Sequence, residues 1–340
     1  MITRSVASVD SLTWQEQLAS SIRDPKKLLQ ILELGTKGGD QSFLNQALSA
    51  SQDFPLRVPM AYLQRITKGD INDPLLLQIL PLKEELTGAP GYTTDPLGEQ
   101  MANPIPGLIH KYHGRVLLIV STNCAINCRY CFRRHFPYQE NKPGRNEWQQ
   151  AIDYIANDSS ISEVIYSGGD PLAASDKQLL WLTEKIAQIS HVKRLRVHTR
   201  LPIVIPDRIT AQCLHWLTST RLLTSIVIHS NHPNELDDNV AQALKRLSQA
   251  GVTLLNQTVL LSGINNSVTT LQQLSERLFQ MGVLPYYLHQ LDHIKGAAHF
   301  EVTDQDAKQI VTQLMAQLPG YLVPKLVREV PDYPNKMPLL

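Results

Sequence analysis

The sequence lacks several features that define whole classes of protein. Its 340 residues include only four cysteines, too few for the disulfide framework of a small secreted domain. An excess of charge of one sign is also missing, because 32 Lys and Arg residues face 31 Asp and Glu residues. No apolar run approaches the roughly 18 residues of a membrane span. We therefore expect a cytoplasmic protein whose main partner is neither nucleic acid nor a membrane.

The chain has enough apolar residues, 43%, to build a sizeable core, and its length allows two domains or a single barrel. From residue 115 onward, short β-branched runs alternate with amphipathic stretches. The runs cover residues 116–120, 163–166, 195–198, 225–229, 253–260 and 284–288, and the helical stretches cover 146–157, 176–189, 207–217, 235–251, 268–282 and 303–318. Six such units predict an α/β fold with a parallel sheet, which can curl into an open barrel.

The two ends of the chain differ from this core. Asp24 followed by Pro25 predicts the start of a helix, and many prolines between Pro55 and Pro106 predict short helices and ordered loops. We therefore expect a helical extension over residues 1–106, a core over 107–320, and a C-terminal segment over 321–340. In parallel β/α folds, the loops after the strands converge at one face and carry the chemistry.

Three of the four cysteines lie in the loop after the first predicted strand. Cys124, Cys128 and Cys131 are close enough for one loop to wrap three thiolates around an inorganic centre. Thiolates favour zinc and iron–sulfur clusters, and three of them on a four-iron cluster leave one iron open for a ligand. A closed zinc site would need a fourth ligand, which His135 could supply. Cys213 lies in a predicted helix, and we expect it to be a buried residue of the core.

The Cys-x3-Cys-x2-Cys spacing, with the aromatic Tyr130 before the last cysteine, resembles that of the radical S-adenosylmethionine (SAM) enzymes. The resemblance implies a partial (β/α)6 TIM-like radical SAM barrel and a [4Fe-4S] cluster whose open iron binds SAM. It also implies that Tyr130 belongs to the cofactor site. A second motif, Ser167-Gly-Gly-Asp-Pro171, follows the second strand and is similar to the Gly-Gly-Glu-type motif that holds the SAM amino group. This similarity assigns Gly168, Gly169 and Asp170 to SAM binding.

Longer stretches look like the lysine 2,3-aminomutase family, from about residue 70 onward. They are Asp95-Pro-Leu, Pro104-Ile-Pro-Gly-Leu-Ile-His-Lys-Tyr, Arg115-Val-Leu-Leu, Cys128-Arg-Tyr-Cys-Phe-Arg-Arg, Thr199-Arg-Leu-Pro-Ile-Val-Ile-Pro-Asp-Arg-Ile, Asn231-His-Pro-Asn-Glu, Leu255-Asn-Gln-Thr-Val-Leu-Leu and Pro285-Tyr-Tyr-Leu. Within the family, the stretches 128–138 and 287–300 look most like the branch that makes (R)-β-lysine for elongation factor P. The resemblance implies L-lysine as the substrate, with a β-lysine ligase and elongation factor P as functional partners.

The family also uses pyridoxal phosphate (PLP). Lys336, in Pro334-Asn-Lys-Met-Pro338, stands in the place of the PLP lysine, although the glycine-rich run typical of the family is absent before it. Arg115 matches a family arginine near the cofactor that serves the PLP phosphate or SAM. We therefore expect Lys336 to be the catalytic lysine of a PLP-dependent isomerase.

Substrate recognition can be argued from charge, because bound lysine presents a carboxylate and a distal ammonium. The resemblance assigns Arg133 to the carboxylate, and the planar fork of an arginine suits that group. It assigns Asp292 to the ammonium, and Glu329 stands where the family has a second aspartate. His289 is a further departure, since the lysine enzymes carry tyrosine there.

Two alternatives remain open from the residues alone. The cluster motif would serve equally well in a radical SAM enzyme that acts on RNA or protein without PLP. The cysteines could instead hold structural zinc in a binding module that docks on a translation factor.

Overall fold

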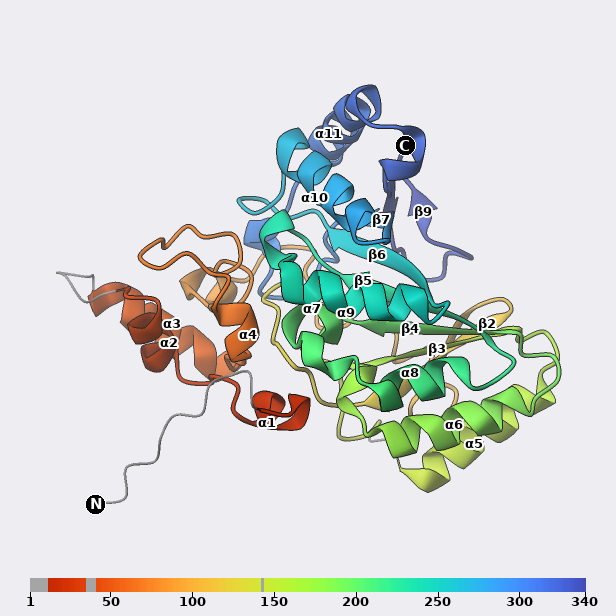
Figure 1. The fold of residues 1–340 in the computed structure, drawn as a ribbon. Coiled ribbons are helices and arrows are strands. Elements are labelled where there is room, and N and C mark those ends of the chain that lie inside the picture. The colour runs from red at the N-terminus through yellow and green to blue at the C-terminus, as the bar shows by residue number, and fades with distance from the viewer. Residues whose placement is uncertain (1–11, 35–40, 142–143) are drawn as a thin grey trace, which may run out of the picture.

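The computed structural model describes residues 12–34, 41–141 and 144–340 (Figure 1). The first helices are α1 (Trp14–Ala19), α2 (Pro25–Ile31), α3 (Gln41–Asp53) and α4 (Met60–Leu63), followed by the 3-10 helix η2 (Lys83–Leu86). The predicted start of α2 is confirmed, because the Asp24 side chain accepts a hydrogen bond from the Lys26 amide and Pro25 occupies the first turn. Short helices separated by loops are what the prolines of this region predict.

A single nine-stranded sheet forms the centre of the molecule, with its strands in chain order. The strands are β1 (Leu108–Tyr112), β2 (Arg115–Ser121), β3 (Glu163–Gly168), β4 (Arg194–Thr199), β5 (Leu223–His229), β6 (Thr253–Val259), β7 (Leu284–His289), β8 (Lys325–Arg328) and β9 (Met337–Pro338). Strands β2 to β8 are parallel, whereas β1 and β9 pair antiparallel at the two edges. All six predicted strands are present, and the segment after residue 320 adds a seventh parallel strand.

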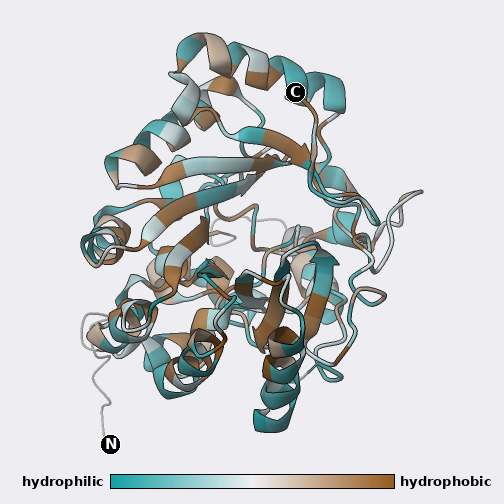
Figure 2. Cartoon of the chain, turned by 90° about the vertical axis from the view of Figure 1, so that its right-hand side faces the viewer, coloured by the Kyte–Doolittle hydropathy of each residue, from teal (hydrophilic) through white to brown (hydrophobic). Residues whose placement is uncertain are grey.

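The helices cover the outer face of this curved sheet, as Figures 1 and 2 show. They are α5 (Arg145–Asn157), α6 (Asp176–Ala187), α7 (Leu201–Val204), α8 (Ala211–Thr218), α9 (Asp238–Gln249), α10 (Val268–Gln280) and α11 (Asp304–Gln317). One predicted helix, 207–217, is split, because Thr210 caps α8 by accepting from the Cys213 amide after the 3-10 helix η4 (Pro206–Arg208). The result is a partial barrel, with helices outside and parallel strands inside.

The N-terminal helices are part of the main hydrophobic core. Trp14, Leu28 and Tyr62 belong to the same buried cluster as Val164 and Leu195 of the sheet. In Figure 2, hydrophobic residues concentrate on the strands and on the helix faces turned toward them. Because burial of apolar surface is the main stabilising contribution, we expect the extension and the barrel to depend on each other for stability. No helix of the described chain is long and apolar enough to cross a membrane.

The two edges of the open sheet are connected by side chains. Lys111 of β1 donates to Glu329, which follows β8, with 2.7 Å between Nζ and Oε1. Lys336, immediately before β9, also donates to Glu329. An ion pair therefore bridges the space between the first and the last strands of the barrel.

Candidate active site

A cavity of about 1350 Å³ opens within the partial barrel. All twelve residues assigned above to cluster, cofactor or substrate line it: Arg115, Cys124, Cys128, Tyr130, Cys131, Arg133, Gly168, Gly169, Asp170, Asp292, Glu329 and Lys336. A typical small-molecule site has a volume of roughly 300–1,000 Å³, so this cavity is large enough for more than one ligand. The structure thus brings together residues that are up to 221 positions apart in the sequence.

The cysteine loop follows the carboxyl end of β2 and turns between Cys128 and Cys131, where amide nitrogen and carbonyl oxygen are 3.1 Å apart. Burial, together with the neighbouring Cys128 thiol, raises the pKa of Cys131 to about 11. A cationic iron centre would offset both effects and stabilise the thiolates, so the three side chains suit a cluster.

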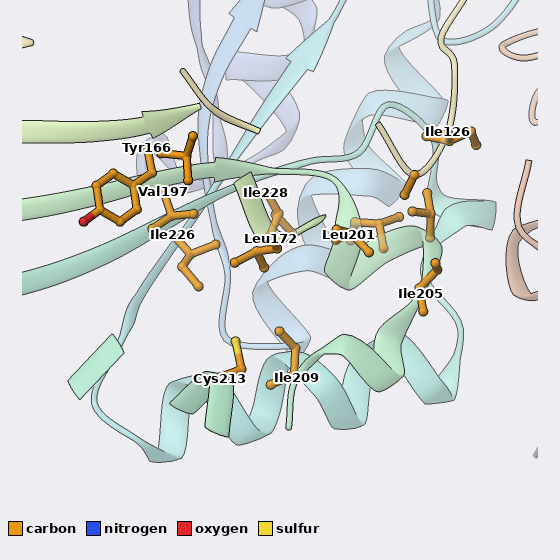
Figure 3. Packing of buried hydrophobic residues seen from close by; sticks show 14 of the residues in the cluster. Ile126, Tyr166, Leu172, Val197, Leu201, Ile205, Ile209, Cys213, Ile226 and Ile228 are labelled. Atoms are coloured by element: carbon orange, nitrogen blue, oxygen red, sulfur yellow. The ribbon is translucent and has the colours of Figure 1, made fainter. Parts of the chain in front are cut away.

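The other two candidate ligands of a zinc site, Cys213 and His135, are not among the residues that line the cavity with the three thiols. Cys213 is fully buried on α8, and Figure 3 shows it within the hydrophobic packing beside Ile209, with its sulfur turned toward the strands. The expectation that it is a core residue is confirmed. His135 does not line the cavity, and its Nε2 lies 3.4 Å from the Lys295 carbonyl oxygen.

The loop after β3 lies directly against the cysteine loop. The Gly169 amide donates to the Ser121 carbonyl and the Asp170 amide donates to the Asn123 carbonyl, each at 2.8 Å. A Cβ atom on Gly169 would lie 2.6 Å from the Asn123 oxygen and 3.0 Å from the Cys124 sulfur. Only glycine fits so close an approach, which leaves backbone rather than side chains facing the thiols at this point.

Asp170 has a structural role in this loop. Its carboxylate accepts from the Thr199 hydroxyl at 2.7 Å and from the amides of Arg200, Leu201 and Leu172 at 2.8, 3.0 and 3.0 Å. Burial raises its pKa to about 6, although these hydrogen bonds oppose the shift. The carboxylate therefore joins the loop after β3 to the start of α7, and any ligand contact from this motif falls to its backbone.

Arg133 is buried in the cavity wall and is already paired. It makes a bidentate contact with Glu99, with two N–O distances of 2.7 Å, and its Nη1 donates to the Ser167 hydroxyl at 2.9 Å. Glu99 comes from the loop before β1, and its amide is held by the Asp95 carboxylate at 3.0 Å. The sequence did not single out Glu99, because only the fold shows that it lies opposite Arg133.

A second charged group lies near the carboxyl end of β8. Glu329 accepts from both Lys111 and Lys336, and these two cations hold its pKa well below the usual range although burial acts in the opposite direction. Asp292 lies in the field of the same groups. Burial and the Glu329 charge raise the pKa of Asp292 to about 7, while Lys336 and Lys111 lower it.

Arg115 lies at the other end of β2 from the cysteine loop. It lies six positions before Ser121, which corresponds to about 20 Å along a strand. Its guanidinium carbon is 4.7 Å from the centre of the Tyr112 ring, and both side chains line the cavity. The position places a cation deep in the barrel, on the side of Lys111 rather than beside the thiols.

Several residues to which the motifs above assign no role also face the cavity. His198, His229 and His289 lie near or at the carboxyl ends of β4, β5 and β7, and the Nε2 atom of each is buried without a hydrogen bond from the described chain. Burial holds the pKa of His198 and His289 well below the usual value and lowers that of His229 to about 3. Neutral imidazoles therefore line this part of the wall. Arg200, which donates to the Cys128 sulfur, is another cavity residue to which the sequence motifs assign no role.

The chain is similar to known proteins over most of its length. Residues 118–274 match the family described as the Radical SAM superfamily. The chain is 49% identical over 323 residues to the L-lysine 2,3-aminomutase of Haemophilus influenzae, covering 95% of this chain and 94% of that protein. It is 49% identical over 326 residues to that of Escherichia coli (strain K12), with 96% and 94% covered, and 45% identical over 337 residues to that of Buchnera aphidicola, with 99% and 98% covered.

Proposed function

This chain belongs to the lysine 2,3-aminomutase family of radical SAM enzymes, and we propose that it makes (R)-β-lysine, which a cytoplasmic ligase attaches to elongation factor P. As a member of the family, it is an isomerase that uses a [4Fe-4S] cluster, SAM and PLP to act on L-lysine. When bound, these groups supply the radical chemistry that moves the amino group from Cα to Cβ. The observation that carries the proposal is the convergence of all twelve assigned residues on one cavity.

The cofactors occupy different parts of the cavity in this proposal. Cys124, Cys128 and Cys131 hold the cluster, and the backbone of the Gly168–Gly169 loop beside them holds the amino group of SAM. Arg115, with Tyr112 of β1 beside it, lies about 20 Å along β2 from the end of the strand that carries the cysteine loop, so we assign Arg115 to the PLP phosphate rather than to SAM.

Lys336 is the better of two candidates for the PLP lysine. Lys111 also faces Glu329, but its ammonium donates in addition to the Leu97 carbonyl at 2.8 Å and so is anchored at two points. Within the described part of the chain, the Lys336 ammonium donates to Glu329 alone. A single carboxylate partner leaves this amine free to move toward a cofactor once Glu329 is held by Lys111.

The substrate groups follow from the charges on the wall. Arg133 faces the carboxylate of lysine with Nη1, while Glu99 holds the other edge of its guanidinium and fixes its plane. Asp292 and Glu329 face the distal ammonium. The strands and their helices surround the reacting atoms and limit their contact with water, which protects a carbon radical from side reactions.

The proposal is tested by anaerobic turnover of L-lysine with SAM, PLP and a reductant, with the product separated by chiral chromatography. The expected product is (R)-β-lysine, and addition of the ligase and elongation factor P should transfer it to the factor, as measured by intact mass. Formation of (S)-β-lysine, or failure of the ligase to accept the product, would contradict the proposal that the enzyme makes (R)-β-lysine for elongation factor P. SAM cleavage without any β-lysine would instead favour a radical SAM enzyme that does not need PLP.

Peptide mapping tests the assignment of Lys336. Borohydride reduction of the PLP-loaded protein fixes the cofactor covalently to its lysine, and we expect the label on the peptide that contains Lys336. Lys111 is the matched control within the same cavity. A label on Lys111 would show that Lys111, and not Lys336, is the PLP lysine.

A further inference from the structure

Two of the family-like stretches, 199–209 and 231–235, meet directly behind the cysteine loop. Arg200 belongs to the first and Glu235 to the second, and both are buried, with side-chain exposures of 6% and 0%. Their carboxylate–guanidinium contact measures 2.8 Å. A fully buried ion pair is costly to desolvate, so its position next to the thiols calls for an explanation.

The contacts of Arg200 divide between its two terminal nitrogens. Nη1 donates to the sulfur of Cys128 at 2.6 Å and to the Tyr130 hydroxyl at 2.8 Å. Nη2 donates to Glu235 and to the Gln78 side-chain oxygen, each at 2.8 Å. The guanidinium is therefore fixed in one orientation, with one edge on a sulfur atom of the cysteine loop.

The acid that balances Arg200 is fixed as well. Glu235 accepts from the backbone amides of Asn231 at 2.8 Å and His232 at 3.1 Å through the oxygen that does not face Arg200. The local charge near Cys128 is thus the small difference between a cation in contact with the sulfur and an anion one group further away. Removal of either partner shifts this balance in a known direction.

We propose that Arg200 is a positioning residue that sets the reduction potential of the cluster through its hydrogen bond to Cys128, and that Glu235 moderates this effect. The inference rests on the proposed cluster site. Reduction adds an electron to the cluster, and a hydrogen-bonded cation at a ligating sulfur stabilises that added charge. Arg200 therefore makes the cluster easier to reduce, and Glu235 makes it harder.

The test is an anaerobic redox titration of the cluster in the full-length protein without SAM, followed by the electron paramagnetic resonance signal of the reduced form. At the wild-type midpoint, Arg200→Gln should lower the ratio of reduced to oxidised cluster by about ten-fold, which is about 59 mV for one electron. Glu235→Gln should raise the ratio, because it leaves the cation unbalanced while its oxygen can still accept from the two amides.

Arg208→Gln is the matched control. Arg208 is also fully buried and paired with an acid, Asp176, at 2.6 Å, but it does not line the cavity. This variant should lose stability without a change of potential. If Arg200→Gln loses its iron, the test uses Arg200→Lys and Glu235→Gln instead. The reduction potential should lie below that of wild type in Arg200→Lys and above it in Glu235→Gln.

Two outcomes would overturn the inference. One is an unchanged potential in an Arg200→Gln protein that keeps its full iron content, and the other is a shift in the same direction in the Arg200 and Glu235 variants. Absence of a cluster from the reconstituted wild-type protein would instead refute the proposed cysteine site. Failure of the inference and failure of the site are therefore distinguishable.

Discussion

Asp292 offers the sharpest quantitative test of substrate binding, because its charge changes near neutral pH. Its pKa is raised to about 7, mainly by burial and by Glu329. Half of the molecules therefore carry a neutral Asp292 at pH 7 in the empty site. Nearby imidazoles do not titrate in this range, since the pKa values of His198 and His289 lie well below the ordinary value. Asp170 also changes charge at the lower end of this range, since its pKa is about 6, so comparison of wild type with an Asp292 variant at each pH is what isolates the Asp292 carboxyl group.

The perturbation is Asp292→Asn, which keeps the shape of the side chain and removes its charge. A charge-assisted hydrogen bond to the substrate ammonium contributes about 1.5–3 kcal/mol, so the variant should lose roughly ten- to a hundred-fold in kcat/KM for lysine at pH 8. At pH 6 only about a tenth of the wild-type carboxyl groups are ionised. The advantage of wild type over variant should then fall by about ten-fold between pH 8 and pH 6.

The same substitution should stabilise the protein at alkaline pH. A raised carboxyl pKa means that the folded state holds its proton more tightly than the unfolded state, so stability falls as pH rises from about 4 to about 7. A shift of roughly three pKa units corresponds to about 4 kcal/mol at most. Because the side chain is partly exposed to the cavity, we expect about half of this. Asp292→Asn should raise the free energy of unfolding at pH 8 and leave it nearly unchanged at pH 4.

The assays are initial rates of β-lysine formation at saturating SAM and PLP, and urea unfolding, each across this pH range. The variant must retain its iron and PLP for the comparison to be valid. A constant ratio of kcat/KM between wild type and Asp292→Asn at pH 6 and pH 8 would refute the reasoning. Asp292 would then be a loop charge, and Glu329 would have to bind the ammonium alone.

Three further substitutions test other parts of the site. Cys128→Ala should abolish the visible iron–sulfur absorbance and SAM cleavage, whereas Cys213→Ala should keep both; cluster retention in the first would reject the ligand assignment. Gly169→Ala should lower iron content and SAM affinity in equilibrium dialysis because its Cβ would meet the Asn123 carbonyl, and equal values in variant and wild type would show that the loop yields. Arg133→Lys should cost roughly ten- to a hundred-fold in kcat/KM for lysine, since one ammonium cannot contact both Glu99 oxygens and the substrate carboxylate at once; a loss confined to thermal stability would make Arg133 a structural partner of Glu99.

The periodicity of the sequence was sufficient to predict the parallel β/α units, and the family resemblance added that they form a partial barrel. Each central parallel strand is a short apolar run flanked by an amphipathic helix, and both patterns are local. The edge strands were not predicted, because β1 follows a proline-rich segment and β9 has only two residues. Their pairing depends on the neighbouring strand rather than on their own composition.

The candidate site was predictable only in part, for a related reason. Cysteine spacing and family resemblance identify residues that act through their own chemistry. Glu99, Lys111 and Arg200 act through partners that are 34, 218 and 72 positions away, so only the fold brings each pair together. The family resemblance included the stretches around Lys111 and Arg200 but assigned no function to either side chain. Asp170 shows the reverse, since its family position suggested a ligand contact and its carboxylate is occupied by the backbone.

The ion pair between Lys111 and Glu329 has a consequence for how the barrel receives its ligands. Every other junction between neighbouring strands is a ladder of backbone hydrogen bonds, which must break cooperatively before two strands separate. At the junction between the first and last strands, the contact is the Lys111–Glu329 ion pair, and these long side chains can move apart and return without unpairing a strand. In the part of the chain that the structure describes, the barrel therefore has one junction without backbone pairing, and we expect bulky cofactors to enter and leave there. Both side chains of the pair are about nine-tenths buried, so salt screens their attraction only weakly. We therefore expect the ion pair to remain formed at cellular ionic strength.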